Sequence, residues 1–196
     1  EAELFINDVV ITQGKGVTEL FTAPYAYVSA KTAAAYGVPP PGAEPKRMDL
    51  DPTQRAGLLT QVGFLSNYSL DRGTNAIIKR GHYVSERLLC AQLGTAPPVP
   101  PEDSDSAQNF KTDRERVTAQ TAPGGCAGCH LKLLNPLGFA FENLGPAGKW
   151  RTVEASGSGG AINAVDAYSF DDSDTLNFDG AVTLMKKLTE RVELHQ

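Results

Sequence analysis

The sequence feature that most constrains this chain is the run Gly-Cys-Ala-Gly-Cys-His at residues 125–130. Cys126 and Cys129 are three positions apart, so on a helix their thiols lie about one turn apart. His130 follows directly and falls on the same side. Such a Cys-x-x-Cys-His signature attaches a c-type haem: both thiols bond the porphyrin, and the histidine reaches the iron. We therefore expect one haem c, covalent through Cys126 and Cys129, with His130 as the proximal iron ligand.

Three other interpretations of this motif are weaker. The chain has three cysteines, an odd number, so the third one, Cys90, cannot complete a closed disulfide set. A thioredoxin-like pair would belong to a βαβ unit, and the sequence shows no such pattern. A zinc site needs four ligands, and only His82 or His195 could complete it. A structural disulfide between Cys126 and Cys129 is the simplest alternative.

Composition excludes several classes of protein. Hydrophobic residues make up 41% of the 196 residues and charged residues 21%, which is typical of a globular domain rather than a disordered chain. The net charge is −5 without any basic block, so we expect no nucleic-acid partner. The apolar stretches are too short for a transmembrane helix. Both ends interrupt apolar or helical patterns, and we expect the chain to be cut from a longer protein.

Periodicity in the first half predicts helices. Residues 1–36 are expected to be mostly helical, with Gly37 as the C-cap. A short helix is predicted to begin at Asp51, with proline in its first turn, and to run to Leu65. The clearest amphipathic helix covers residues 74–90. Its apolar stripe consists of Ile77, Gly81, Val84 and Leu88.

The second half alternates short helices with turns. Residues 112–120 are predicted to form a helix that opens with a capping box of Thr112 and Glu115. The cysteine motif begins the next helix, which we expect residues 135–138 to end. A small hairpin is expected within residues 150–177. The last helix begins at Gly180, with a buried side formed by Val182, Leu184, Met185, Leu188 and Val192.

These patterns predict a mainly α fold. We expect a cytochrome-c-like haem domain with long irregular loops and one small β-hairpin, packed on a helical N-terminal platform. Residues 1–95 form the platform, as the end of a preceding domain and the start of the haem domain. Residues 96–111 form a proline-rich acidic loop, and residues 112–196 bear the haem.

Several stretches, in order, resemble one family. They are residues 20–25, 55–61, 79–81, 84–90, 97–101, 126–130, 135–139, 142–143, 148–151 and 178–180. The set resembles the C-terminal half of the exported, uncharacterised planctomycete-type cytochrome c proteins, which are built from consecutive domains of unknown function. The resemblance implies a haem, a larger parent protein and no particular reaction. It also implies that Cys90 pairs with a cysteine outside this chain or is a buried thiol.

Residues around the motif are candidates to surround the haem. A backbone carbonyl of Pro136 or Leu137 is expected to accept the imidazole N–H of His130, which would orient the ring and raise its basicity. Phe139 and Trp150 are candidates to line the haem, although ordinary core packing is the alternative.

The sequence alone does not identify the sixth iron ligand. Met185 and His82 rank ahead of Met48 and His195. A thioether ligand would raise the reduction potential, but Met185 also fits the apolar stripe of the last helix. A five-coordinate iron, or a ligand from outside this chain, is an equal alternative.

The favoured function is single-electron transfer within a larger exported redox protein. Its partners would be other parts of that protein or other electron-transfer cytochromes, and no catalytic residue is assigned. Because covalent haem attachment takes place outside the cytoplasm, we expect a periplasmic or extracellular location. One alternative is a haem oxidoreductase whose open iron position binds peroxide, oxygen or an organic substrate. The other is a haem-free structural or binding domain.

Overall fold

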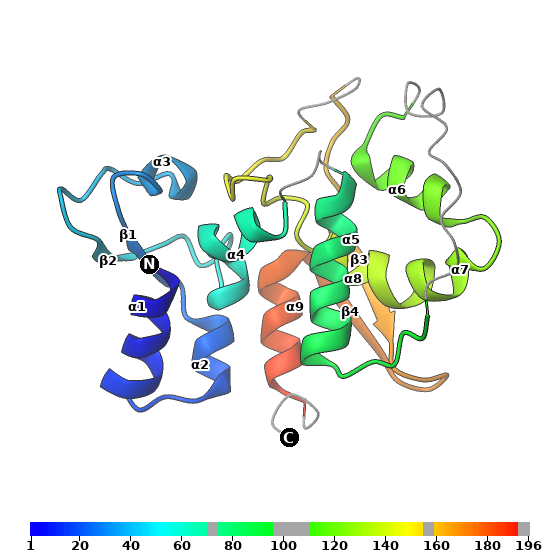
Figure 1. Ribbon diagram of the computed structural model, residues 1–196, viewed down its shortest axis with the longest axis horizontal. Coiled ribbons are helices and arrows are strands. Elements are labelled where there is room, and N and C mark those ends of the chain that lie inside the picture. The colour runs from blue at the N-terminus through cyan, green and yellow to red at the C-terminus, as the bar shows by residue number, and fades with distance from the viewer. Residues whose placement is uncertain (70–73, 96–109, 155–158, 192–196) are drawn as a thin grey trace.

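The computed structural model describes residues 1–69, 74–95, 110–154 and 159–191. This part of the chain is mainly α, as the sequence predicts (Figure 1). It contains two small antiparallel hairpins, where one was expected. The elements in chain order are α1 (Ala2–Asn7), η1 (Asp8–Thr12), α2 (Val17–Thr22), β1 (Tyr25–Val28), α3 (Ala33–Tyr36), β2 (Lys46–Asp49), η2 (Leu58–Thr60), α4 (Val62–Asn67), α5 (Thr74–His82), η3 (Tyr83–Leu88), α6 (Asp113–Thr121), α7 (Cys126–Cys129), η5 (His130–Leu134), α8 (Asn135–Phe139), β3 (Val165–Ser169), β4 (Thr175–Asp179) and α9 (Gly180–Thr189).

The N-terminal region contains a hairpin that the sequence analysis missed. Helices α1 and α2 form as predicted, but β1 pairs with β2 in antiparallel register, Tyr25 opposite Asp49. Pro24 ends α2, because the residue before a proline is pushed into extended backbone. The aromatic side chains of Tyr25 and Tyr27 and the β-branched side chain of Val28 then favour a strand over a helix. The expectation of a mostly helical segment through residue 36 was therefore wrong at β1, while Gly37 is the left-handed C-cap predicted for α3.

The predicted helix start at Asp51 was also wrong. Asp51 and the three residues after it form a turn, in which the Asp51 carboxylate accepts hydrogen bonds from the backbone N–H and hydroxyl of Thr53. Aspartate competes in this way with helical backbone bonds. Helical structure begins only at η2 and continues in α4 after Gln61.

The amphipathic helix predicted over residues 74–90 is confirmed in its main part. It runs as α5 and then as the π-helical segment η3, which ends at Leu88. Ile77 and Val84 on its apolar stripe are buried. Gly81, on the same stripe, allows a close backbone contact instead of contributing an apolar side chain.

Gly81 and Gly138 bring α5 and α8 into backbone contact. A Cβ atom on Gly81 would lie 2.0 Å from the carbonyl oxygen of Leu134, and one on Gly138 would lie 2.1 Å from that of Ile77. The helix stop predicted at residues 135–138 was therefore wrong. The backbone there continues as α8, with Pro136 in its first turn, where a missing N–H is tolerated.

Both halves of the chain contribute to the main hydrophobic core. Its buried members include Phe21, Leu59, Leu65 and Val84 from the first half and Leu137, Phe141, Leu144, Leu184, Met185 and Leu188 from the second. Helix α9 packs beside α2, and its buried side is as predicted at Leu184, Met185 and Leu188. Val192 and residues 96–109 of the predicted proline-rich loop lie outside the described residues.

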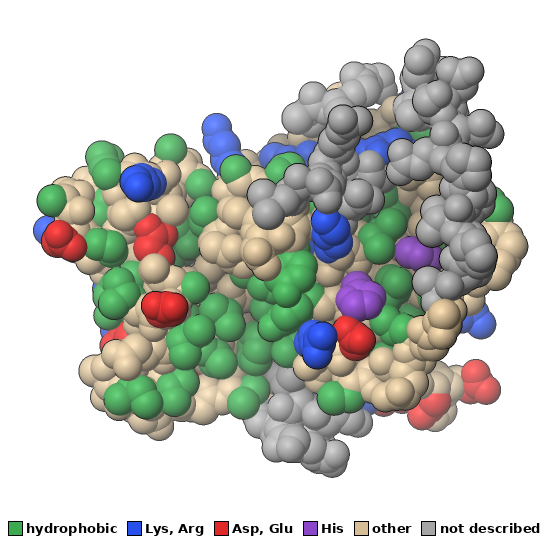
Figure 2. Space-filling model, viewed as in Figure 1, with side chains coloured by type: hydrophobic (Ala, Val, Ile, Leu, Met, Phe, Trp, Pro, Cys, Tyr) green, Lys and Arg blue, Asp and Glu red, His purple; other side chains and the backbone are tan. Residues whose placement is uncertain are grey.

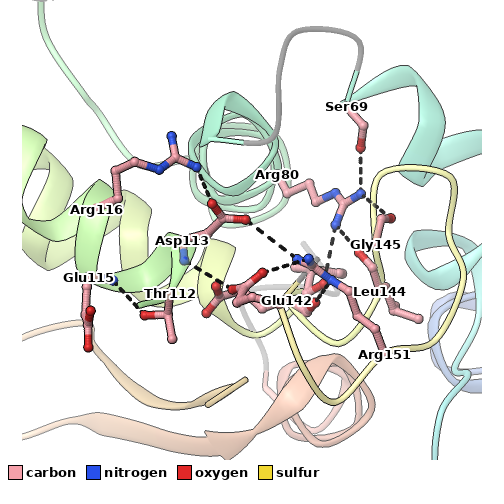
Figure 3. A network of polar contacts seen from close by, with 12 residues as sticks. Ser69, Arg80, Thr112, Asp113, Glu115, Arg116, Glu142, Leu144, Gly145 and Arg151 are labelled. Carbon is pink, nitrogen blue, oxygen red and sulfur yellow. Dashed lines mark hydrogen bonds and ion pairs between the residues drawn. The ribbon is translucent and has the colours of Figure 1, made fainter. Parts of the chain in front are cut away.

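Two buried arginines hold the irregular backbone around this core. Arg80 on α5 donates to the carbonyl oxygens of Leu144 at 2.7 Å and Gly145 at 3.1 Å, and to the hydroxyl of Ser69 at 2.6 Å (Figure 3). Burial lowers the pKa of Arg80 to about 9, with a smaller effect from the charge of Arg151. Arg55 donates to the carbonyl oxygens of Thr60, Ala35 and Gly148.

Replacing Gly138 with alanine should destabilise the protein by about 3 kcal/mol, because α5 and α8 would have to move apart. Thermal or urea unfolding, followed by circular dichroism, measures this loss. The matched control is Gly63→Ala in α4, where a Cβ would lie 3.9 Å from the Ala2 Cβ, an ordinary contact. That variant should be stabilised by roughly 0.5–1 kcal/mol. A Gly138→Ala protein as stable as the Gly63→Ala protein would contradict the backbone contact.

Candidate functional site

The cysteine motif opens a helix, as predicted. Cys126 and Cys129 are the first and last residues of α7, and His130 begins the π-helical segment η5. All three side chains belong to partly exposed residues, and both cysteines are free thiols. The motif is therefore accessible from the surface.

A surface cavity of about 540 Å³ borders the motif. The Cys129 thiol donates a hydrogen bond to the carbonyl oxygen of Leu93, 3.5 Å away. Leu93 lines this cavity together with His82, Glu86, Cys90, Ala91, Gln92 and Gly94. Figure 2 shows histidine side chains on one face of the molecule, and His82 and His130 are the histidines of the described residues. The cavity is open to solvent and its lining is more polar than apolar.

The imidazole of His130 contacts a side chain rather than the expected backbone carbonyl. Its Nδ1 lies 3.4 Å from Oδ1 of Asn135, the residue directly before Pro136. The Asn135 side-chain N–H donates to the Thr121 hydroxyl at 2.8 Å, and that hydroxyl donates to the Val117 carbonyl oxygen at 2.7 Å. Both Asn135 and Thr121 are buried. The ring of His130 is thus held by a chain of polar contacts that reaches into α6.

The candidates for the sixth iron ligand lie in different environments. His82 lines the cavity, its side chain is 49% exposed, and its Nδ1 lies 3.7 Å from a carboxylate oxygen of Glu86. Met185 is 1% exposed in the main core. Met48 lies on β2 and packs against a small cluster of buried residues that includes Val28 and Leu50. His195 lies outside the described residues.

The predicted lining residues pack in the protein interior. Pro136 and Leu137 are buried in α8. Phe139 packs in a cluster with Ile77 and Val117, with the Arg114 guanidinium 4.1 Å from its ring centroid. Trp150 is partly buried against the main core.

Cys90 is exposed, so the expectation of a buried thiol was wrong. Its backbone has a φ of 54°, a left-handed conformation that is uncommon for a residue other than glycine. This bend places Cys90 after η3, on the wall of the 540 Å³ cavity. A disulfide partner outside this chain stays a prediction.

The structure also contains a buried cluster of carboxylates that sequence analysis did not single out. Asp113 and Glu142 lie beside Arg151 (Figure 3). Glu154 forms an ion pair with Arg151. Arg151 donates to the Glu154 carboxylate at 2.7 Å and to the backbone oxygen of Glu142 at 3.0 Å. Among the described residues, neither carboxyl oxygen of Glu142 has a hydrogen-bond partner. Burial, and then the charge of Glu154, raises the pKa of Glu142 to about 8.

The described residues contain neither a metal-binding cluster nor a membrane-spanning helix. No group of three or more His, Cys, Asp or Glu side chains in the described segments is arranged to hold a metal ion. No helix in the same segments is long and apolar enough to cross a membrane.

The comparisons with known proteins show the family. A family model described as PSCyt3, protein of unknown function (DUF1588), matches residues 55–154, just over half of the chain. The chain therefore belongs to this family of planctomycete-type cytochrome c domains of unknown function, in agreement with the resemblance found in the sequence. The match spans both Arg80 and the cysteine motif. No curated protein and no solved structure matches the chain.

The buried carboxyl of Glu142 should make stability depend on pH. The folded protein retains this proton in a range where the unfolded chain, with an ordinary pKa of 4.5, has released it. The contribution of Glu142 to stability should therefore fall as the pH rises from about 4.5 to about 8. Each unit of pKa difference corresponds to about 1.4 kcal/mol.

Glu142→Gln removes this titration while keeping the shape of the side chain. As the pH rises from 5 to 8, the free energy of unfolding of the variant should increase by a few kcal/mol relative to that of the parent. This is the order of magnitude expected from the raised pKa of Glu142. Urea unfolding at both pH values measures the gain. Glu44→Gln, at an exposed position, is the control and should track the parent. A Glu142→Gln profile parallel to the parent's would refute the prediction.

Proposed function

We propose that this domain carries one haem c, bonded through Cys126 and Cys129 with His130 as the proximal iron ligand, and serves single-electron transfer. Bound haem would supply an iron that accepts and releases one electron. The observation that carries the proposal is the state of the motif: two free, partly exposed thiols one helical turn apart, followed by a histidine, beside a cavity of about 540 Å³.

The donor set fits a haem. A haem iron takes four ligands from the porphyrin, so one histidine at the motif suffices on the proximal side. The ring contact of His130 to Asn135 uses Nδ1 and leaves Nε2 for a metal. Membership of a cytochrome c family supports the same assignment.

We propose His82 as the sixth ligand. It lines the cavity bordered by the motif, and the Glu86 carboxylate beside its Nδ1 would orient the ring. Met185, in contrast, is enclosed by the leucines of α9 and the main core, which makes it a packing residue. Six-coordinate iron suits an electron carrier, because it offers no open position to a substrate.

The proposed setting is a larger exported redox protein. Covalent attachment of haem takes place outside the cytoplasm, so the location would be periplasmic or extracellular. Electrons would pass to other parts of the same protein or to other cytochromes.

Haem attachment can be tested by producing the chain with a cytochrome c maturation system and measuring its mass and pyridine haemochrome spectrum. One haem per chain is expected, and the Cys126→Ala, Cys129→Ala double variant should lose it. Cys90→Ala is the matched control and should retain it, because Cys90 stands outside the motif. A parent protein without a Soret band would overturn the proposal in favour of a haem-free structural domain.

The sixth ligand can be tested by adding carbon monoxide to the reduced, haem-loaded protein. The parent spectrum should not change, whereas His82→Ala should bind carbon monoxide. Met185→Leu, a volume-conserving change, should behave like the parent. Carbon monoxide binding by Met185→Leu and not by His82→Ala would assign the ligand to Met185. Binding by the parent itself would favour the haem oxidoreductase.

A further inference from the structure

A π-helical turn places Asn135 over His130. The backbone N–H of Asn135 donates to the carbonyl oxygen of His130, five residues earlier. In an α-helix the stacked neighbours would be residues 133 and 134 instead. Pro136 explains the change, because it has no N–H to donate to the carbonyl four residues before it. The helix therefore widens by one residue before α8 begins, a feature often found at functional sites.

Hydrogen-bond counting fixes which way the Asn135 amide faces. The single hydroxyl proton of Thr121 goes to the Val117 carbonyl oxygen at 2.7 Å, so the Thr121 oxygen must accept from Asn135. The amide nitrogen of Asn135 therefore faces Thr121, and its oxygen faces Nδ1 of His130. The flipped amide would require Thr121 to give up its bond to Val117. It would also bring an N–H donor toward Nδ1.

We propose that Asn135, oriented by Thr121, is a positioning residue that keeps the proton of His130 on Nδ1. An oxygen acceptor beside Nδ1 favours the tautomer in which Nδ1 carries the proton and Nε2 presents its lone pair. Nε2 is thereby the atom available to iron, which deepens the proposed function. Such an acceptor also raises the basicity of the ligating nitrogen. The carbonyls of Pro136 and Leu137 are not needed for this task.

The tautomer is measurable without haem. In the haem-free 196-residue chain with ¹⁵N-labelled histidine, long-range ¹H–¹⁵N correlations report which ring nitrogen carries the proton. His82→Gln and His195→Gln variants assign the His130 signals. The parent should show the Nδ1–H tautomer. Thr121→Val, which cannot accept from Asn135, should lose that preference, while Thr121→Ser, which keeps the hydroxyl, should retain it.

The haem-loaded protein gives a second readout. Weaker hydrogen bonding to Nδ1 makes the ligand less basic, so Thr121→Val should raise the midpoint potential relative to the parent. Asn135→Asp, with a carboxylate acceptor, should lower it. Circular dichroism and thermal unfolding confirm that each variant is folded, since Thr121 and Asn135 are buried.

The outcomes separate this proposal from haem binding. A folded Thr121→Val chain with the parent's tautomer would overturn the role of Asn135, even if haem attaches. A parent chain with the Nδ1–H tautomer that attaches no haem would instead overturn the proposed function and leave the positioning role standing. Equal potentials in the haem-loaded parent, Thr121→Val and Asn135→Asp proteins would also count against Asn135.

Discussion

The backbone contact between α5 and α8 is the constraint on which the rest of the structure depends. Each helix contributes one glycine at which a carbonyl oxygen occupies the place of a side chain: that of Leu134, the last residue of η5, at Gly81, and that of Ile77 in α5 at Gly138. Because η5 leads directly into α8, the same contact also sets where His130 emerges from the fold. The candidate site is therefore anchored to the main core through helix backbone rather than through a loop.

Buried cations complement this contact. The segment after α8 turns several times and leaves carbonyl groups that no helix or strand satisfies. Arg80, one residue before Gly81, supplies donors to Leu144 and Gly145, and Arg55 supplies one to Gly148. A guanidinium carries several N–H donors and can satisfy several carbonyls at once. These hydrogen bonds offset the free-energy cost of burying the charge, the same burial that lowers the pKa of Arg80. Both arginines thus make an irregular segment part of a packed structure.

Local patterns predicted the elements that local forces determine. The stripe of α5 with η3, the buried side of α9 and the Thr112 cap of α6 follow from periodicity and capping chemistry. The cap differs in one detail: the Glu115 carboxylate accepts from Lys111 rather than from Thr112. The burial of Arg80 and Glu142 could not be predicted from local patterns. Arg80, for example, is buried by its contact with Leu144, which lies more than sixty residues further along the chain. For Glu142 the available signal was its position directly after the apolar residues 139–141. Arg80 stands between Lys79 and Gly81, so its surroundings in the sequence gave no such signal.

Pro136 shows why the motif was easier to predict than its surroundings. The Cys-x-x-Cys-His spacing is local, so sequence alone identifies Cys126, Cys129 and His130 as a unit. A proline six residues further on is a helix stop by local rules, yet the helix here passes it by inserting a π-helical turn. Packing against α5 makes the continuation favourable, because α8 brings Gly138 onto the Ile77 carbonyl. The wider turn then stacks Asn135 on His130, so the residue that disrupts the helical pattern also builds the polar environment of the candidate ligand.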